Sequence, residues 1–436
     1  MKSRDGTMSH PHPNSLWAAI TPPRAPAPAL QEPVETEIAV IGGGFSGLST
    51  ALHLAKSGRK VVVLEGASVG WGASGRNNGQ VIPTLTAAEP DAIEARHGEA
   101  GARFVALIRD SAEALFALVR DEAIACEAEQ TGWFQPAHRP SRMKLSEKRV
   151  EAWARRGAPC RLVGRDEAIA LLGSKDWHGG MYNPTGGHIN PLALARGLAA
   201  ACEARGVRIF ENTRVTGTER VGPRWQVRTE SAIVRADTVV LATNAYTDAL
   251  APALAPKVAA SLVPVLSWQM ATEPLSAEQR ATIIPGRQAI SDTHGDLRFF
   301  RYDARNRLVT GGALIVPANG AERLRRLVGA RLAGAFPALE TPRFSHVWNG
   351  YIGITEDRFP HIHRLGPDFW GWAGCNGRGV ALALSLGREL AGAINGAPLD
   401  TLALPVSDVK PIAFQGLARR IAPCVLALYR WRDGRD

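Results

Sequence analysis

Residues 37–65 read EIAVIGGGFSGLSTALHLAKSGRKVVVLE, and this stretch decides the fold. An apolar run enters a glycine-rich turn, a segment with helical spacing follows, and a second apolar run ends at Glu65. This order predicts a strand, a helix and a second, parallel strand, which together form one βαβ unit. The spacing G-x-G-x-x-G is supplied by Gly42, Gly44 and Gly47.

Each glycine of this turn has a steric reason. Gly42 permits the tight turn, Gly44 lets the backbone approach a pyrophosphate, and Gly47 lets the helix pack on the strand. The free N–H groups at the start of the helix then hold phosphates. Glu65 follows Gly42 by 23 residues, close to the spacing of about 20 expected for a carboxylate that accepts from ribose hydroxyls. The unit therefore predicts a dinucleotide site, and the acid disfavours NADP, whose 2′-phosphate it would repel.

The size and composition of the chain bound the rest of the fold. At 436 residues and 46.7 kDa the chain exceeds the roughly 250–300 residues that one hydrophobic core serves, so we expect two domains. Hydrophobic residues make up 45%, charged residues 21%, and there are 44 glycines. These values are typical of a globular α/β protein and exclude wholesale disorder, collagen-like repeats and coiled coil.

The charge and the cysteines limit partners and location. A net charge of +10 favours phosphates, acidic metabolites or an anionic membrane. Nucleic acid is not expected, because basic residues are scattered and no zinc finger, basic zipper or RNP-type motif occurs. Five widely spaced cysteines predict neither a disulfide framework nor a metal site. With no signal peptide and no apolar run of about 18 residues, we expect a cytoplasmic protein without a transmembrane segment.

Three further segments are rich in small residues and follow or precede apolar runs. They are GWGASGRNNGQV at residues 70–81, ADTVVLATNAY at 236–246 and FWGWAGCNGRGVA at 369–381. The small residues of the 70–81 segment would let its backbone run close to a flat ring. The second predicts a buried strand that returns to the same sheet, and the third predicts a second strand-to-helix junction with free N–H groups.

In this order and spacing, the GGGFSGL, GWGASGRNNGQ, LATNAY and GCNGRGV motifs resemble the FAD-dependent amine and amino-acid oxidoreductases of the D-amino acid oxidase superfamily. Within the superfamily the chain is most similar to the γ-glutamylputrescine oxidase branch, from about Ser15 to the end of the last glycine-rich helix. The resemblance implies an α/β fold. It would have an FAD-binding Rossmann-like domain and an interleaved α+β substrate domain built on an antiparallel sheet.

The expected division of the chain follows from where the cofactor motifs lie. Residues 1–35 form an irregular N-terminal arm; 36–90, 186–250 and 349–398 form the FAD-binding domain; 91–185 and 251–348 form the substrate domain; and 399–436 form a tail with a short amphipathic helix. The first substrate segment holds an amphipathic helix, with Phe104, Ile108, Leu115, Phe116 and Val119 on one side. The second holds strands at 261–272, 297–302 and 307–313.

The resemblance also implies roles for individual residues. The glycines of the first turn would hold the pyrophosphate, and Glu65 would bind the ribose of the adenosine. The 70–81 segment would lie along the isoalloxazine ring and the ribityl chain. Val215 would contact the adenine, and the 377–380 turn would lie at the pyrimidine edge of the flavin. The implied FAD-binding residues are Gly42, Gly44, Phe45, Ser46, Gly47, Glu65, Gly72, Ala73, Ser74, Arg76, Asn77, Asn78, Gln80, Val215, Ala242, Thr243, Gly377, Arg378, Gly379 and Val380.

One departure from the family pattern bears on the substrate. Family members that oxidise simple amino acids typically carry G-[LY]-R-P, whose arginine clamps the substrate carboxylate. Here the chain reads Gly350-Tyr351-Ile352-Gly353, with an isoleucine where that arginine would stand, and the pattern I-x-[IV]-T-x-[DN]-R-x-P that begins at Ile352 resembles the γ-glutamylputrescine branch instead. Arg301 or Arg378 could replace the clamp, so small amino acids are only partly excluded.

Each of the other candidate residues could have a purely structural role instead of a functional one. For the substrate pocket the candidates are Trp268, Arg301, Tyr351, Arg378 and His188. Trp268 and Tyr351 either line it or fill core, and His188 in GGHINP is more simply part of a capped turn. His361 and His363 are expected as a surface pair without metal, and Cys375 as a packed thiol beside non-covalent FAD.

The tail carries apolar residues with arginines around them, from Gly416 to Arg435. This pattern suits docking on the tail's own domain, and less readily a partner or a membrane surface.

The sequence thus predicts an FAD-dependent enzyme that oxidises an amine C–N bond. Hydride passes to flavin N5, the imine hydrolyses, and oxygen or another acceptor takes the electrons. Two alternatives stay open: an oxidase or dehydrogenase of N-methyl or cyclic secondary amino acids such as sarcosine or pipecolate, and a non-catalytic flavin-binding subunit.

Overall fold

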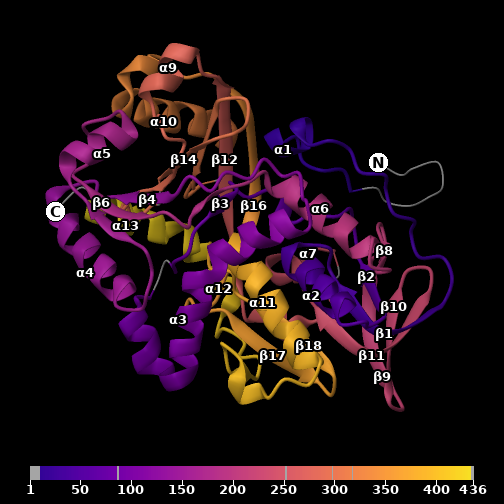
Figure 1. Ribbon diagram of the computed structural model, residues 1–436. Helices are drawn as coiled ribbons and strands as arrows, with labels where there is room; N and C mark the ends of the chain where they lie inside the picture. The colour runs from indigo at the N-terminus through magenta and orange to yellow at the C-terminus, as the bar shows by residue number, and fades with distance from the viewer. Residues whose placement is uncertain (1–9, 86–87, 251–252, 297, 317, 434–436) are drawn as a thin grey trace.

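The structure, a computed structural model, describes residues 10–85, 88–250, 253–296, 298–316 and 318–433. Leu297, which lies in a predicted strand, is outside these residues, as are the domain positions 86–87 and 251–252 and the two ends. The described chain forms a nine-stranded, an eight-stranded and a two-stranded sheet. In Figure 1 the first lies at the lower right, and helices α9 (Ala277–Thr282) and α10 (Gly320–Ala335) lie at the top, over the second.

The nine-stranded sheet is built around the predicted βαβ unit, which the structure confirms. Strand β1 (Val34–Ile41) runs parallel to β2 (Val61–Leu64) on one side and to β11 (Ile233–Leu241) on the other. The remaining strands are β8 (Arg208–Phe210), β9 (Val215–Val221), β10 (Arg224–Thr229), β17 (His361–Gly366), β18 (Phe369–Ala373) and β19 (Val406–Ser407). The central strands are almost continuously apolar because both faces of the sheet are buried.

Helices cover one face of this sheet. Helix α2 (Phe45–Lys56) lies between α11 (Gly379–Ile394) and α6 (Pro191–Glu203), and Leu48 and Leu52 of α2 share a core with Ile38 and Val40 of β1. The other face packs a second cluster that includes Ala39, Ile41 and Val227. This arrangement brings the N-termini of α2 and α11, both of which follow parallel strands, to the same edge of the sheet (Figure 1).

The eight-stranded sheet follows the order β16, β12, β15, β14, β13, β4, β6, β5. Its strands are β4 (Trp133–Pro136), β5 (Arg161–Val163), β6 (Gly180–Asn183), β12 (Val263–Pro274), β13 (Ala289–Ser291), β14 (Phe299–Tyr302), β15 (Arg307–Gly312) and β16 (Phe344–Ile354). The pairs are antiparallel, as predicted, except that β13 and β4 run parallel. Strand β16 crosses the predicted domain boundary at 348/349, because it pairs with β12 along its whole length.

Helices α10, α9, α5 (Arg165–Leu172) and α4 (Met143–Ala154) belong to this half of the molecule. The long α3 (Pro90–Asp121) kinks at Gly98 and packs on α11. Its predicted apolar face is confirmed, since all five of its named residues are buried.

The N-terminal arm departs from the prediction of irregular structure. Residues 16–20 form a short helix, α1 (Leu16–Ile20), and the Ser15 side chain accepts from the backbone N–H of Ala18. Leu16 and Trp17 are fully buried against Trp348 of β16. The arm is ordered because these two apolar side chains pack into a hydrophobic cluster around Trp348, which the sequence pattern does not predict.

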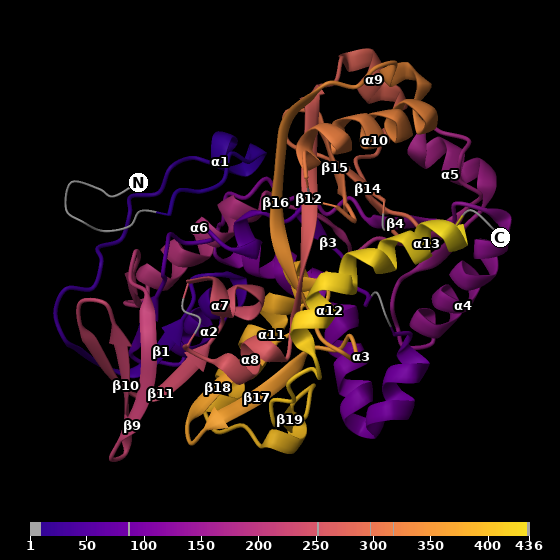
Figure 2. The ribbon, with the colours of Figure 1, turned by 180° about the vertical axis from the view of Figure 1, so that it is seen from behind.

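The C-terminal tail ends in two helices, α12 (Gln415–Ile421) and α13 (Val425–Asp433), joined by a tight turn at Ala422–Cys424. Figure 2 shows both helices on the outside of the molecule, with α12 at the lower end of β12 and α13 running from there toward the C-terminus. The short elements α7 (Thr247–Leu250), α8 (Pro256–Ala260), β3 (Gln80–Val81) and β7 (Gly187–His188) complete the chain. Among the described residues, no helix is long and apolar enough to cross a membrane.

Candidate active site

A cavity of about 930 Å³ lies between the two large sheets. Its wall is formed by the N-termini of α2 and α11, the 71–80 segment, the facing parts of β12 and β16, and the inner side of α12 and α13. The volume is at the upper end of the range for cofactor and ligand pockets, which are commonly found between domains.

The glycine-rich turn after β1 leaves no room for side chains. Gly42 has φ +112°, and a Cβ there would lie 2.8 Å from the Ala242 oxygen. A Cβ at Gly47 would lie 2.0 Å from the Gly42 oxygen, so Gly47 sets the contact between helix and strand. At Gly44 a Cβ would meet Ser74 Oγ at 2.9 Å. The turn therefore presents bare backbone and a helix N-terminus to the cavity, which suits a phosphate.

Glu65 lies at the end of β2, beside this turn. One carboxylate oxygen accepts from the Gly43 N–H at 2.7 Å and the other from the Ala67 N–H at 2.8 Å, and both hold the side chain in one orientation. Burial raises the pKa of Glu65 to about 7, although these two donors act in the opposite direction. A carboxylate fixed in this way at the cavity wall can accept from hydroxyl groups of a ribose.

The backbone of the 76–79 segment is held by four donors from other parts of the chain. Each of the four successive carbonyl oxygens accepts one hydrogen bond. The pairs are Trp348 Nε1 to Arg76 at 2.8 Å, Trp17 Nε1 to Asn77 at 2.8 Å, Arg301 Nε to Asn78 at 2.6 Å and the Ile189 N–H to Gly79 at 2.9 Å. The segment is therefore rigid where it borders the cavity.

The second strand-to-helix junction leads from β18 into α11. Gly374, Asn376 and Gly377 all have positive φ, and Asn376 Oδ1 accepts from the backbone N–H of Thr355 at 3.1 Å. Arg378 precedes the first residue of α11 and lines the cavity. Burial lowers the pKa of Arg378 to about 10, and among the described residues its buried Nε has no hydrogen-bond partner. The Arg378 guanidinium group and the α11 N-terminus make this corner of the cavity favourable for an anion.

An aromatic group forms part of the wall nearest the substrate sheet. The Arg76 guanidinium lies 4.3 Å from the centre of the Trp71 ring, and its Nε donates to the Trp71 oxygen at 2.7 Å. The Tyr246 ring lies edge-on to Trp71 at 5.7 Å and to Tyr351 at 5.8 Å. Tyr246 Oη accepts from the Tyr351 N–H at 3.0 Å. These contacts tie the 71–80 segment to β16.

The structure brings the predicted cofactor residues together on one wall. All of these residues belong to the part of the chain that the structure describes. Of the set, only Gly47 does not border the cavity, because it packs behind Gly42. The residues on the wall are Gly42, Gly44, Phe45, Ser46, Glu65, Gly72, Ala73, Ser74, Arg76, Asn77, Asn78, Gln80, Val215, Ala242, Thr243, Gly377, Arg378, Gly379 and Val380.

Three of the predicted substrate-pocket residues do not line the cavity, whereas Tyr351 and Arg378 do. Arg301 is buried, and its guanidinium group donates hydrogen bonds to the backbone oxygens of Asn78, Tyr302 and Ile189. Trp268 projects from the opposite face of β12 to Ser267 and packs beside the start of α10. These positions are corrections, because the sequence does not show which face of a strand meets the cavity.

His188 is the third of these residues. It is fully buried in β7, and Nε2 lies 3.0 Å from the Arg287 oxygen. Burial lowers the pKa of His188 well below its usual range, so the ring is neutral. The side chain contacts the backbone of Arg287, and the residue does not line the cavity.

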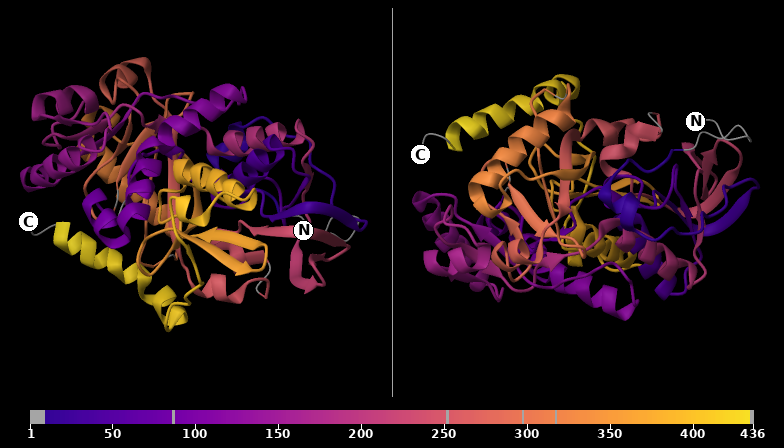
Figure 3. Two further views of the ribbon diagram at one scale, coloured as in Figure 1. Left: turned by 60° about the horizontal axis from the view of Figure 1, so that its bottom comes forward. Right: turned by 90° about the horizontal axis from the view of Figure 1, so that it is seen from above.

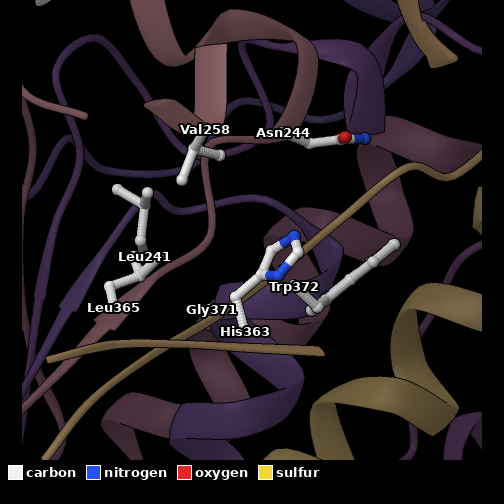
Figure 4. Close-up of a pocket in the computed structure, with 7 residues that line it drawn as sticks. All are labelled: Leu241, Asn244, Val258, His363, Leu365, Gly371 and Trp372. Carbon is white, nitrogen blue, oxygen red and sulfur yellow. The ribbon is translucent and has the colours of Figure 1, made fainter. Parts of the chain in front are cut away.

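The His361 and His363 pair also differs from the prediction of a surface pair. The rings stack with centres 5.8 Å apart, but His363 is only 4% exposed, and its Nδ1 lies 3.1 Å from the Ser407 oxygen of β19. Figure 4 shows His363 in a small hollow with Leu241, Val258 and Trp372. The hollow has no room for a water molecule. In the described part of the chain, no three His, Cys, Asp or Glu side chains gather as metal ligands.

Sequence reasoning missed several residues of the wall. Trp71 and Tyr246 lie inside the quoted motifs and could have been found there. Ser267 and Gln269 of β12, and Val425, Leu426 and Tyr429 of α13, carry no sequence signal for this role. The amphipathic pattern of the tail shows that one side is buried, but not against what.

Comparison with known proteins identifies the family. The family described as FAD dependent oxidoreductase matches residues 37–393. The chain is a member of that family. FAD is its cofactor, and the enzyme is an oxidoreductase that acts on amines or amino acids.

Two curated relatives resemble this FAD-dependent oxidoreductase over most of their length. Gamma-glutamylputrescine oxidoreductase of Escherichia coli (strain K12) is 32% identical over 387 residues, which are 88% of this chain and 89% of the relative. The probable oxidoreductase OrdL of Haemophilus influenzae is 32% identical, with 85% of each chain covered.

Solved structures show the same fold. L-proline dehydrogenase from P. horikoshii superposes with a TM-score of 0.68 at 23% identity, covering 83% of this chain and 94% of that one. Glycine oxidase from Geobacillus kaustophilus gives a TM-score of 0.69 at 21% identity, covering 83% and 95%.

The cavity of this FAD-dependent oxidoreductase fits the cofactor on its own evidence. The bare backbone at Gly42 and Gly44 admits a pyrophosphate, the Glu65 carboxylate suits a ribose, and the unpartnered Nε of Arg378 suits a carbonyl or anion.

Proposed function

We propose that this enzyme oxidises the C–N bond of an elongated amine of the γ-glutamylputrescine type. The observation that carries the proposal is Ile352, which stands on the cavity wall where amino-acid oxidases of this family carry a carboxylate-binding arginine. The similarity to gamma-glutamylputrescine oxidoreductase, over 88% of this chain, supports the same substrate class.

Ile352 lies opposite Val265 in the β12–β16 pairing, and both residues border the cavity. Leu266 and Ile354 border it nearby. An apolar patch of this kind does not compensate a carboxylate next to the reacting carbon, because a buried unpaired charge is costly. It does accommodate the methylene chain of a long amine, whose charged groups would lie farther away.

FAD, when bound, supplies the acceptor for the hydride on the carbon next to the amine nitrogen. We assign the residues predicted for FAD binding to that role, with Glu65 at the ribose, the 71–80 segment at the ring system and Arg378 at the pyrimidine edge. The chain itself positions the amine, keeps it unprotonated by burying it among apolar side chains, and excludes water. Tyr351, Ile352 and Leu426 provide such surfaces.

A second function is favoured by Arg378. Its buried Nε has no partner among the described residues. Of the two arginines predicted to replace the absent carboxylate-binding arginine, Arg301 and Arg378, only Arg378 lines the cavity. If Arg378 receives a substrate carboxylate, the substrate would be a secondary amino acid such as sarcosine or pipecolate.

An anaerobic absorbance titration of the yellow holoprotein tests both functions. γ-Glutamylated polyamines, free polyamines, sarcosine, pipecolate and D-amino acids are added in turn, and loss of the oxidised-flavin band is followed. Bleaching by the first class supports our proposal. Bleaching by a secondary amino acid that is abolished when its carboxylate is esterified would support the second function instead.

The same titration tests two remaining alternatives. Bound flavin that no amine bleaches would indicate a non-catalytic subunit. Re-oxidation on admitting air would identify oxygen as the acceptor, and its absence would indicate another acceptor. We place the enzyme in a reducing compartment such as the cytoplasm, because its five cysteines are free thiols.

A further inference from the structure

The helices α12 and α13 carry a continuous exposed apolar stripe. Its members follow a helical spacing of three and four residues, which the turn at Pro423 does not interrupt. They are Phe414, Leu417, Ile421, Cys424, Leu428 and Trp431, of which Ile421 also borders the cavity at its edge. Exposed fractions are 85% for Phe414, 58% for Leu417 and 53% for Trp431. More than half of the large exposed hydrophobic side chains in the described residues lie between 414 and 431.

The opposite side of the same helices is partly buried and held in place by specific contacts. Tyr429 and Leu426 line the cavity, and Arg430 Nε pairs with the buried Asp296 at 3.2 Å. Asp433 accepts from the Gly295 N–H at 2.8 Å, and Tyr429 Oη accepts from Arg358 at 3.1 Å. The stripe therefore faces outward because the other side is anchored. Figure 3 shows α13 at the margin of the molecule in both views.

The charged side chains within the segment that carries the stripe are all basic, whereas Asp408 and Asp433 flank the segment in the sequence. Residues 409–432 contain Lys410, Arg419, Arg420, Arg430 and Arg432, and no Asp or Glu. Arg430 turns inward to Asp296, and Arg419 lies 3.5 Å from Asp248. Lys410, Arg420 and Arg432 are exposed beside the apolar residues.

This charge distribution discriminates between the possible occupants. In a symmetric dimer through this face, the two basic segments would face each other and repel. An anionic lipid surface complements the charge, and its acyl boundary accepts the apolar side chains. Tryptophan and basic residues flanking an apolar helix face are typical of helices that lie in a membrane interface.

We propose that the outer face of α12 and α13 docks this enzyme on an anionic lipid surface. The helices lie in the interface plane and do not cross the membrane. Since their inner side borders the cavity, docking places that side of the active site next to the lipid. This inference is independent of the identity of the amine.

Vesicle sedimentation of the full-length holoprotein tests the proposal. Vesicles of phosphatidylcholine are compared with vesicles that contain about 30% phosphatidylserine. We expect the protein to co-sediment with the anionic vesicles, and to be released as salt is raised to about 0.5 M, where the charge attraction is screened. Equal binding to both kinds of vesicle, or no binding to either, would overturn the proposal.

Matched variants distinguish docking through the stripe from non-specific hydrophobic adsorption to lipid. Leu417→Ser with Leu428→Ser removes two side chains of the stripe that do not line the cavity, and we expect binding to fall about tenfold or more. Leu162→Ser with Val221→Ser removes two exposed apolar side chains elsewhere and should leave binding unchanged. Equal effects of the two pairs would contradict the proposal, with flavin content and circular dichroism as checks of folding.

A fluorophore on Cys424 gives a direct readout. Cys424 is the exposed cysteine of the five and lies within the stripe. An environment-sensitive label there should shift to the blue with anionic vesicles but not with phosphatidylcholine alone. A dimer in size-exclusion chromatography that the Leu417→Ser, Leu428→Ser variant abolishes would show that a second copy covers the stripe, and would overturn the lipid assignment.

Discussion

The Nε atom of Arg301 donates a hydrogen bond of 2.6 Å to the backbone oxygen of Asn78, 223 positions earlier in the chain. The other guanidinium nitrogens donate to the oxygens of Tyr302 and Ile189. One buried side chain thus joins β14 of the eight-stranded sheet to the segment that borders the cavity. Its role is to position that segment.

Replacing Arg301 with Met should weaken both the fold and FAD binding. The change leaves buried carbonyl oxygens without a donor, so we expect a loss of roughly 2–5 kcal/mol in the free energy of unfolding. The 76–79 segment would also loosen, and FAD affinity should fall about tenfold or more. Urea unfolding and flavin titration of the apoprotein measure the two effects. Arg326→Met, at a largely exposed site, is the control, and an equal effect there would contradict the assigned role.

Gly47→Ala should abolish FAD binding or folding. The new Cβ would lie 2.0 Å from the Gly42 oxygen, so α2 must shift away from the turn. Gly392→Ala in α11 is the matched control, because a Cβ there meets its nearest neighbour at 3.9 Å. We expect the control to gain up to about 1 kcal/mol in helix stability. Flavin content of the purified proteins decides the comparison, and a yellow Gly47→Ala protein would refute it.

FAD affinity should depend on pH through Glu65. Burial raises the pKa of this carboxyl to about 7, and ribose hydroxyls donate to its ionised form. Protonation therefore competes with binding, and affinity should fall by up to about tenfold for each pH unit below 7. Flavin fluorescence quenching between pH 6 and 8.5 measures the effect. Glu65→Gln should bind more weakly and without this pH dependence, whereas Glu99→Gln on the exposed surface of α3 should retain it.

Ile352→Arg should change the preferred substrate. It places a guanidinium on the cavity wall at the position where the G-[LY]-R-P pattern would have its arginine. We expect kcat/KM for sarcosine or pipecolate to rise about tenfold, and activity on the long amine to fall. Ile352→Met keeps the volume and apolar character and should preserve the original preference. Unchanged ratios in the arginine variant would show that the substrate carboxylate does not approach this position.

The accuracy of the sequence-based predictions depended on the range of the interactions involved. Residues 42–47 and 374–380 were identified correctly as strand-to-helix turns, because positive φ and close backbone contacts require glycine at specific local positions. For Trp268 the sequence left open whether the side chain lines the pocket or fills core, since alternation shows which residues share a face but not which face meets the cavity. His188 and Arg301 stand near the cofactor segments, yet their partners come from distant parts of the chain.

The amino-acid sequence by itself determined the family and the cofactor and pointed to residues that line the cavity, because these follow from short motifs whose backbone geometry is local. Only the tertiary structure decided that Arg378 and not Arg301 lines the cavity, how Trp17 and Trp348 hold the 76–79 segment, and that one side of the tail lines the cavity while the other stays exposed. Those outcomes depend on how two sheets and a terminal helix pair close on one another, and contacts across hundreds of residues leave no periodic signal in a single sequence.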